Sequence, residues 1–122
     1  MEKDTPKERD IKLLEQAMVS SDNQARWAAA AELGELVYTE PETLWPIVLK
    51  HGTSTDEDLQ TAVATCLLEH ILEHHFDAFF PKLEVEIRGG NTNLRSTLEC
   101  CWQFDLTEEQ VTRWEKLLKE TA

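Results

Sequence analysis

The sequence predicts an all-α fold, arranged as a short right-handed α-solenoid of three helix pairs with a capping helix at the C-terminus. Three observations predict this fold. Helix start signals recur along the chain, apolar residues follow them at helical spacing, and the whole pattern repeats after about 34 residues. The chain has 122 residues, of which 41% are hydrophobic, and we expect residues 1–122 to form one domain.

The first two helices are predicted from their capping residues. Residues 5–8 read Thr-Pro-Lys-Glu, a capping box with proline at the first helical position, and an apolar face follows them: Ile11, Leu13, Leu14 and Met18. Residues 21–24 read Ser-Asp-Asn-Gln and open an alanine-rich helix that is expected to continue to Val37. Gly34 lies inside this second helix, where we expect it to let a neighbouring helix approach closely.

The next two helices are also predicted from the residues at their ends. Residues 39–42 read Thr-Glu-Pro-Glu and start a short third helix that ends near Gly52. Thr55 or Asp56 then begins a long fourth helix, which is expected to reach about His74.

The last three helices are predicted to begin at Asp77, at Asn91 or Asn93, and at the capping box of residues 107–110. Gly89-Gly90 ends the first of them, and the closing helix spans residues 108 to 121. Residues 83–87 alternate apolar and acidic side chains, as a half-buried strand would. Helix remains the preferred prediction, because the segment also carries a helical apolar face and because the repeat requires it.

The repeat is the strongest signal. A shift of about 34 residues brings Asp22, Asp56 and Asn91, the predicted starts of three helices, into register. The pairs that then align are Ala25-Arg26, Leu59-Gln60 and Leu94-Arg95, followed by Leu33, Leu67 and Trp102. The register therefore predicts that Trp102 is buried, and the match of Trp45 with Phe80 places Trp45 in the core.

Residues 22–34 resemble the second helix of a HEAT-like repeat, because they combine an acidic cap, an apolar-Arg pair, small residues and a final Leu-Gly. The match weakens in the second repeat, where Gln60 replaces the arginine and Leu68 replaces the glycine. The resemblance covers roughly residues 6 to 104 through its period. It implies a scaffold with a partner-binding surface and does not by itself imply an activity.

Charge narrows the class of partner. Acidic residues outnumber basic residues 24 to 12, and the resulting net charge of −12 disfavours DNA, RNA and anionic membranes. A basic protein is the natural complement, although acidity can also serve solubility alone. The chain has no apolar stretch of the roughly 20 residues that span a bilayer and no signal-peptide pattern, so it is expected to be cytoplasmic.

Cys66, His70 and His74 are spaced four residues apart and would share one ridge of a helix. A metal-binding regulatory or enzyme accessory protein could use such a ridge. Packing and helix-end roles are the preferred interpretation, because Cys66 aligns with Cys101 of the next repeat. No metal or cofactor is therefore predicted, and the three cysteines, Cys66, Cys100 and Cys101, are expected to be buried reduced thiols.

No catalytic constellation is evident, so an enzyme is not predicted. Close glutamates such as Glu69 and Glu73 arise by chance in so acidic a chain, and Gly89-Gly90 ends a helix without forming a phosphate-binding loop.

The second helices of the three pairs are expected to line a concave face that binds a basic partner protein. Its predicted contact residues are Trp27, Glu32, Glu35, Glu57, Thr61, Glu69, Glu73, Ser96, Glu99 and Gln103. The sharpest hypothesis is an immunity or antitoxin-type inhibitor of a cationic toxin, since the chain resembles small acidic bacterial immunity proteins in size and charge. The alternatives are the metal-binding protein above and a general structural adaptor without charge selectivity.

Overall fold

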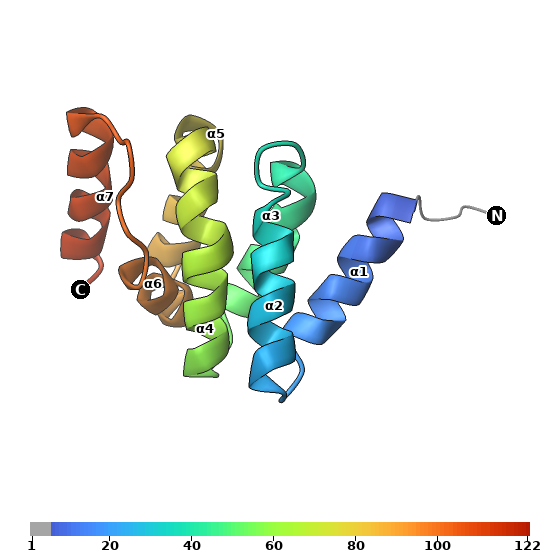
Figure 1. Ribbon diagram of the computed structural model, residues 1–122. Helices are drawn as coiled ribbons and strands as arrows, with labels where there is room; N and C mark the ends of the chain where they lie inside the picture. The colour runs from blue at the N-terminus through green and yellow to red at the C-terminus, as the bar shows by residue number, and fades with distance from the viewer. Residues whose placement is uncertain (1–5) are drawn as a thin grey trace.

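The structure is a computed structural model that describes residues 6–122, and within that range all regular elements are helices (Figure 1). The elements are α1 (Pro6–Met18), α2 (Asn23–Gly34), α3 (Pro41–Gly52), α4 (Glu57–Val63), the π-helix η1 (Ala64–Leu68), α5 (Glu69–Arg88), α6 (Thr92–Glu99) and α7 (Glu108–Glu120). The all-α prediction is confirmed. The capping role predicted for Thr5 lies outside the described residues. None of the helices described combines the length and the apolarity that crossing a bilayer requires.

Four of the predicted caps are present. The side chain of Asp22 accepts from the backbone N–H of residue 24 at 3.0 Å, and Asp56 accepts from residue 58 at 3.1 Å. Asn91 accepts from residue 94 at 3.0 Å. Thr107 and Gln110 exchange the two hydrogen bonds of a capping box. These bonds satisfy N–H groups that have no partner inside the helix, which explains why the helices begin where the sequence indicated.

Gly34 both ends α2 and allows the predicted close approach. Residues 35–39 form turns with tighter hydrogen bonds, such as Leu36 N–H to Leu33 O at 3.0 Å, so α2 does not extend to Val37 as expected. A Cβ atom at Gly34 would clash with the backbone oxygen of Cys66 in η1. The absence of a side chain therefore brings α2 directly against the π-helical turn.

The long fourth helix runs through α4 and η1 into α5, and it does not end at a cap. The helical path breaks at His75, whose φ of −139° and ψ of 35° are not helical, so a break lies next to the predicted end at about His74, and the chain then continues as helix to Arg88. Asp77 lies two residues beyond the kink, in the first turn of the second half, so the prediction that it caps a new helix is wrong. The imidazole Nε2 of His75 lies 3.0 Å from Val37 O, which ties the kink to the turn after α2.

The segment with strand-like alternation is helical. Leu83 and Ile87 are buried four residues apart on one face of α5, and Val85 between them is 71% exposed. Burial therefore follows the helical period, as the preferred prediction required.

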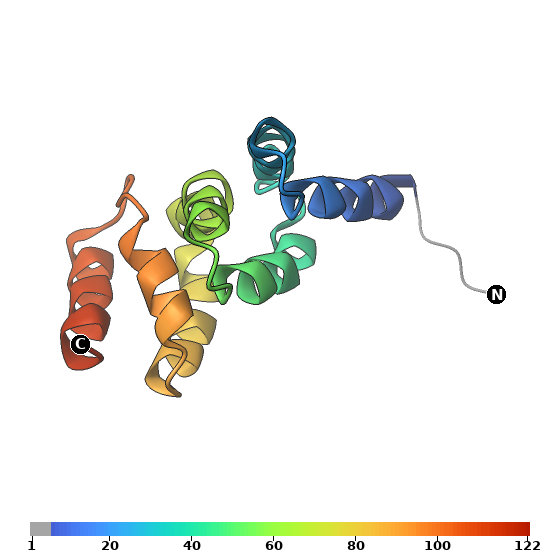
Figure 2. The same ribbon diagram turned by 90° about the horizontal axis from the view of Figure 1, so that it is seen from below.

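Successive helix pairs lie side by side from α1 at one end to α7 at the other (Figures 1 and 2). Side chains at equivalent positions of the repeat link each unit to the next. Arg26 of α2 reaches Asp56 at 3.1 Å, Gln60 of α4 reaches Asn93 O at 3.3 Å, and the Arg95 Nη2 of α6 donates to an α7 backbone oxygen at 2.7 Å. The sequence register thus corresponds to a recurring contact between neighbouring units.

The core confirms most of the predicted register but not its last position. Leu33 and Leu67 are completely buried, and Trp45 is only 8% exposed. Trp102, which aligns with the two leucines, is 70% exposed, so the prediction of burial is wrong. The reason is that α6 ends at Glu99, and the chain leaves the helical path before it reaches Trp102.

Candidate protein-binding surface

The residues predicted to bind a partner do not form one continuous exposed face. Glu32, Glu35, Glu57, Ser96, Glu99 and Gln103 are exposed, whereas Thr61 and Glu73 are half-buried. Trp27 is half-buried, and its indole Nε1–H donates to Asp58 at 3.3 Å. Ala30, Ala64 and Leu68, which lie between these residues along the chain, are completely buried. Gln103 follows the end of α6 and is not on a helix, so the predicted ridge is interrupted by core positions and by a loop.

A groove of about 400 Å³ lies between α2 and the η1–α5 segment. It brings together residues that the sequence analysis assigned to different roles. The lining residues are Ala31, Gly34, Glu35, Tyr38, Thr65, Cys66, His70 and His74. We call it the histidine groove.

The imidazoles of the histidine groove are held by one carboxylate. Glu73 Oε1 lies 3.0 Å from His70 Nδ1 and 3.3 Å from His74 Nε2, and the ring of Tyr38 packs on that of His74 with centroids 4.2 Å apart. Across residues 6–122 no three His, Cys, Asp or Glu side chains are arranged to hold a metal ion. The ridge of Cys66, His70 and His74 is thus organised by hydrogen bonds and ring packing.

The thiols are less uniformly buried than expected. Cys66 and Cys101 are half-buried, but Cys100 is exposed, so the expectation that all three are buried is only partly right. Burial raises the pKa of the Cys66 thiol and of the Cys101 thiol above the usual value. Both therefore remain protonated at neutral pH, which is unfavourable for nucleophilic chemistry.

Glu69 is buried, with only 5% of its surface exposed, and cannot form part of an external acidic face. One carboxylate oxygen accepts from the Trp102 backbone N–H at 3.0 Å, and the other lies 3.7 Å from His70. The Phe104 ring stacks on the His70 imidazole with centroids 6.0 Å apart. These contacts attach the segment after α6 to α5. The repeat register did not indicate them, because it predicts that Trp102 lies in the core.

Burial raises the pKa of the Glu69 carboxyl, with a smaller contribution in the same direction from Glu73, while the Trp102 N–H and His70 act in the opposite direction. A raised folded-state pKa means that the folded protein holds this proton more tightly than the unfolded chain does. The stability contributed by the neutral carboxyl is therefore complete below the unfolded value of about 4.5 and is lost as pH rises through the folded pKa.

We expect Glu69→Gln to remove this dependence while its amide oxygen keeps the Trp102 bond. The stability advantage of the wild type over the variant should fall as pH rises above 4.5, and urea unfolding at several pH values measures it. Glu115→Gln, at an exposed position of α7, corrects for the loss of one negative charge. Identical pH profiles for the wild type and Glu69→Gln would contradict the prediction.

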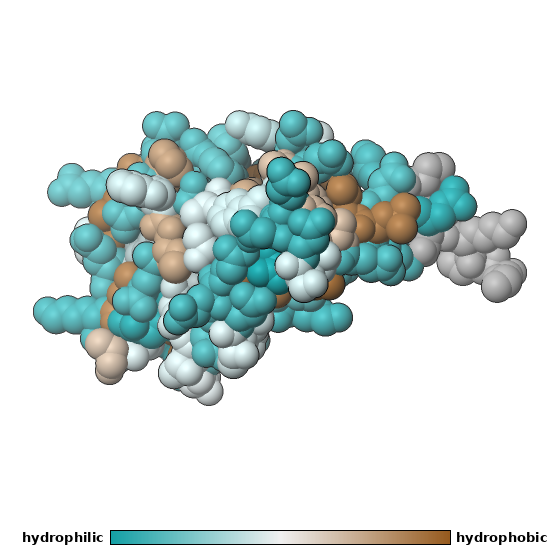
Figure 3. Space-filling view, turned by 60° about the horizontal axis from the view of Figure 1, so that its bottom comes forward, coloured by the Kyte–Doolittle hydropathy of each residue, from teal (hydrophilic) through white to brown (hydrophobic). Residues whose placement is uncertain are grey.

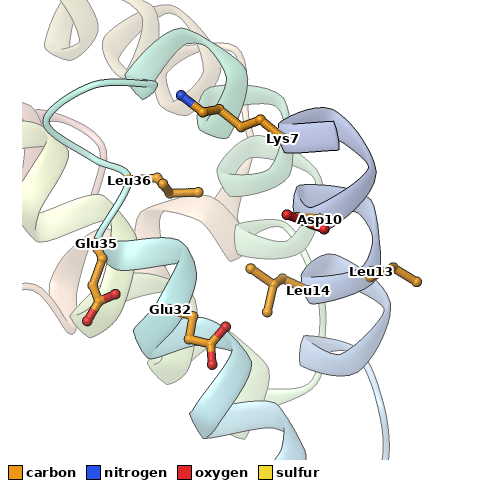
Figure 4. Close-up of a pocket in the computed structure, with 7 residues that line it drawn as sticks. All are labelled: Lys7, Asp10, Leu13, Leu14, Glu32, Glu35 and Leu36. Atoms are coloured by element: carbon orange, nitrogen blue, oxygen red, sulfur yellow. The ribbon is translucent and has the colours of Figure 1, made fainter. Parts of the chain in front are cut away.

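A second and larger groove, of about 750 Å³, lies between α1 and α2 (Figure 4). Its lining residues are Lys7, Asp10, Leu13, Leu14, Glu32, Glu35 and Leu36, and we call it the α1–α2 groove. The sequence analysis placed Leu13 on the same apolar face as Ile11, but the structure separates the two. Ile11 is 4% exposed and Leu13 is 63% exposed. Glu32 and Glu35 are the predicted contact residues that lie here.

Several cations of the fold form ion pairs with its own carboxylates. The pairs are Lys7–Glu40 at 2.9 Å, Arg26–Asp58 at 2.9 Å, Arg88–Glu120 at 2.8 Å, Arg95–Glu99 at 3.1 Å and Arg113–Glu84. Because carboxylates are twice as numerous as cations, a large surplus of negative charge remains. Hydrophilic residues cover most of the face shown in Figure 3, with one hydrophobic patch at the end that carries α1 and smaller ones at the opposite end. No protein-family model, curated protein or solved structure matches the chain.

Proposed function

We propose that the protein is a non-enzymatic binding module for a basic partner protein. The observation that carries this proposal is the charge distribution. Arg26, Arg88, Arg95 and Arg113 are paired with carboxylates of the same chain, and because 24 acidic residues face 12 basic ones, surplus carboxylates give the net charge of −12. Such a surface attracts lysines and arginines and repels nucleic acid.

The proposed scaffold is a short right-handed α-solenoid of HEAT-like helix pairs with α7 as its capping helix. Its support is the recurring link between neighbouring units made by Arg26, Gln60 and Arg95, which occupy one register of the sequence repeat. Stacked helix pairs of this kind present extended surfaces on which a partner can lie.

In its most specific form the proposal is an immunity or antitoxin-type inhibitor that covers the cationic face of a toxin. A small acidic protein can mask a nucleic-acid-binding face because it competes with phosphate for the same lysines and arginines. The two grooves described above are open to solvent and accept side chains from a large ligand. The alternative of a general adaptor differs in one measurable respect, since its binding would not depend on charge.

The proposal is tested by the salt dependence of partner binding. Immobilised protein is incubated with cell extract at about 0.1 M salt, where electrostatic attraction extends about 10 Å, and is then washed at about 1 M salt, where it extends about 3 Å. We expect the bound proteins to be basic and to dissociate in the high-salt wash. Capture of neutral or acidic proteins that stay bound in 1 M salt would instead support the adaptor.

A further inference from the structure

The α1–α2 groove has an apolar floor that no described element covers. In Figure 1, α1 meets α2 near the α1–α2 turn and diverges from it towards the N-terminus of α1. Leu14 from α1 and Leu36 from the turn after α2 face the space between the helices, and Leu13 lines the groove from α1 with its side chain directed outward (Figure 4). Leu13 is 63% exposed and is therefore accessible to a partner.

The rim of the groove is acidic. Asp10, Glu32 and Glu35 line it, and none of the three carboxylates has an ion-pair partner among residues 6–122. The only cation of the lining, Lys7, is neutralised by Glu40 at 2.9 Å. An occupant therefore meets an apolar floor flanked by three negative charges.

We propose that the α1–α2 groove binds an amphipathic helix of a basic partner protein, an inference that deepens the proposed function and rests on it. A helix presents apolar side chains at i, i+3, i+4 and i+7, which can pack on the three leucines, and it can carry lysine or arginine on the flanks of that stripe. The carboxylates of both walls then pair with the flanking cations. Leu13, Glu32 and Glu35 determine the affinity.

A second copy of the chain is a poorer occupant for the same reason. Each copy carries a net charge of −12, so a self-association through this acidic rim would bring like charges together. A strand is also disfavoured, because the described residues offer no sheet edge to which it could add.

The test uses the full chain and a fluorescent amphipathic peptide of lysine and leucine, about 15 residues long, that is long enough to form a helix. A scrambled peptide of the same composition, without the helical apolar period, controls for charge. We expect the amphipathic peptide to bind more tightly than the scrambled one in fluorescence anisotropy. NMR chemical-shift changes should be concentrated on α1, α2 and residues 35–36.

Leu13→Ser removes the apolar contact from an exposed position and is expected to weaken peptide binding about tenfold. Val85→Ser is its matched control, because Val85 is 71% exposed on α5, outside the groove. Equal affinities for Leu13→Ser and Val85→Ser would overturn the inference. Circular dichroism and thermal unfolding establish that both variants are folded.

The role of charge is tested with the double variant Glu32→Lys/Glu35→Lys. Its control is Glu108→Lys/Glu115→Lys, which changes the net charge equally on the exposed surface of α7. We expect about tenfold weaker binding at 0.1 M salt for the first pair and little change for the second. Equal losses would overturn the groove assignment while leaving the proposed function standing. Salt-insensitive binding of the wild type would overturn both the groove assignment and the proposed function. A dimer in sedimentation that Leu13→Ser disrupts would assign the groove to a second copy of the chain.

Discussion

Gly34→Ala is expected to destabilise the protein by about 2–3 kcal/mol, which corresponds to a fall of about 10 °C in the melting temperature. Helix propensity alone predicts that Gly34→Ala stabilises the protein, because alanine is favoured over glycine in a helix by about 1 kcal/mol. The new Cβ would meet the backbone oxygen of Cys66, and the backbone of a helix cannot move aside as a flexible side chain can. α2 would have to shift away from η1.

Gly52→Ala is the matched control for Gly34→Ala. Its Cβ would meet a methyl group of Leu94 at 3.1 Å, and a leucine side chain can adjust by a few tenths of an ångström. We expect Gly52→Ala to change the free energy of unfolding by less than about 1 kcal/mol. If Gly34→Ala proves as stable as the wild type in urea unfolding, the close approach of α2 and η1 is not a stabilising contact.

Arg26→Ala is expected to cost about 3 kcal/mol. Arg26 is only 7% exposed and lies between two units, where Nε donates to Met18 O at 3.0 Å and Nη1 donates to Asp58 at 2.9 Å. Nη2 donates to Asp56 at 3.1 Å. Its removal leaves the Met18 carbonyl oxygen without its side-chain donor, takes the cation away from Asp56 and Asp58, and opens a gap between α1, α2 and α4.

Arg88→Ala is the control, because the Arg88–Glu120 pair is exposed on both sides and such pairs contribute at most about 1 kcal/mol.

The loss of stability caused by Arg26→Ala should also depend on pH. Hydrogen bonds from the Leu59 N–H and from Arg26 hold the pKa of Asp56 below its usual value. The stability that this carboxylate contributes is present above the unfolded pKa and is lost as pH falls through the folded pKa. The difference between the wild type and Arg26→Ala should therefore narrow in acid, and an unchanged difference would show that Asp56 is not involved.

Helix starts were the most predictable part of the fold. Asp22, Asp56, Asn91 and Thr107 cap their helices through hydrogen bonds to residues two or three positions ahead, so the information lies within one turn of the chain. Helix ends were less predictable. The fourth helix was predicted to end at about His74, next to the kink at His75, but α2 ends at Gly34 and does not continue to Val37 as expected.

The candidate site was predictable only in part, because exposure depends on neighbours that are distant in sequence. Glu32 and Glu35 lie on the acidic rim of the α1–α2 groove, as part of a predicted binding face, but Glu69 is buried under the segment that follows α6. The apolar pattern of α1 could not separate the buried Ile11 from the exposed Leu13. That separation requires knowing on which side of α1 the second helix packs.

The helical class, the helix starts, the repeat and the acidity could all be predicted from the sequence, because capping, periodicity and composition are local or additive properties. Only tertiary packing distinguishes the exposed Leu13 from the buried Ile11, buries Glu69 and leaves Trp102 outside the core. It also decided that α1 and α2 diverge over three leucines with unpaired carboxylates beside them. These outcomes depend on the angle and depth at which helices pack, and packing is a property of residue pairs far apart in the chain.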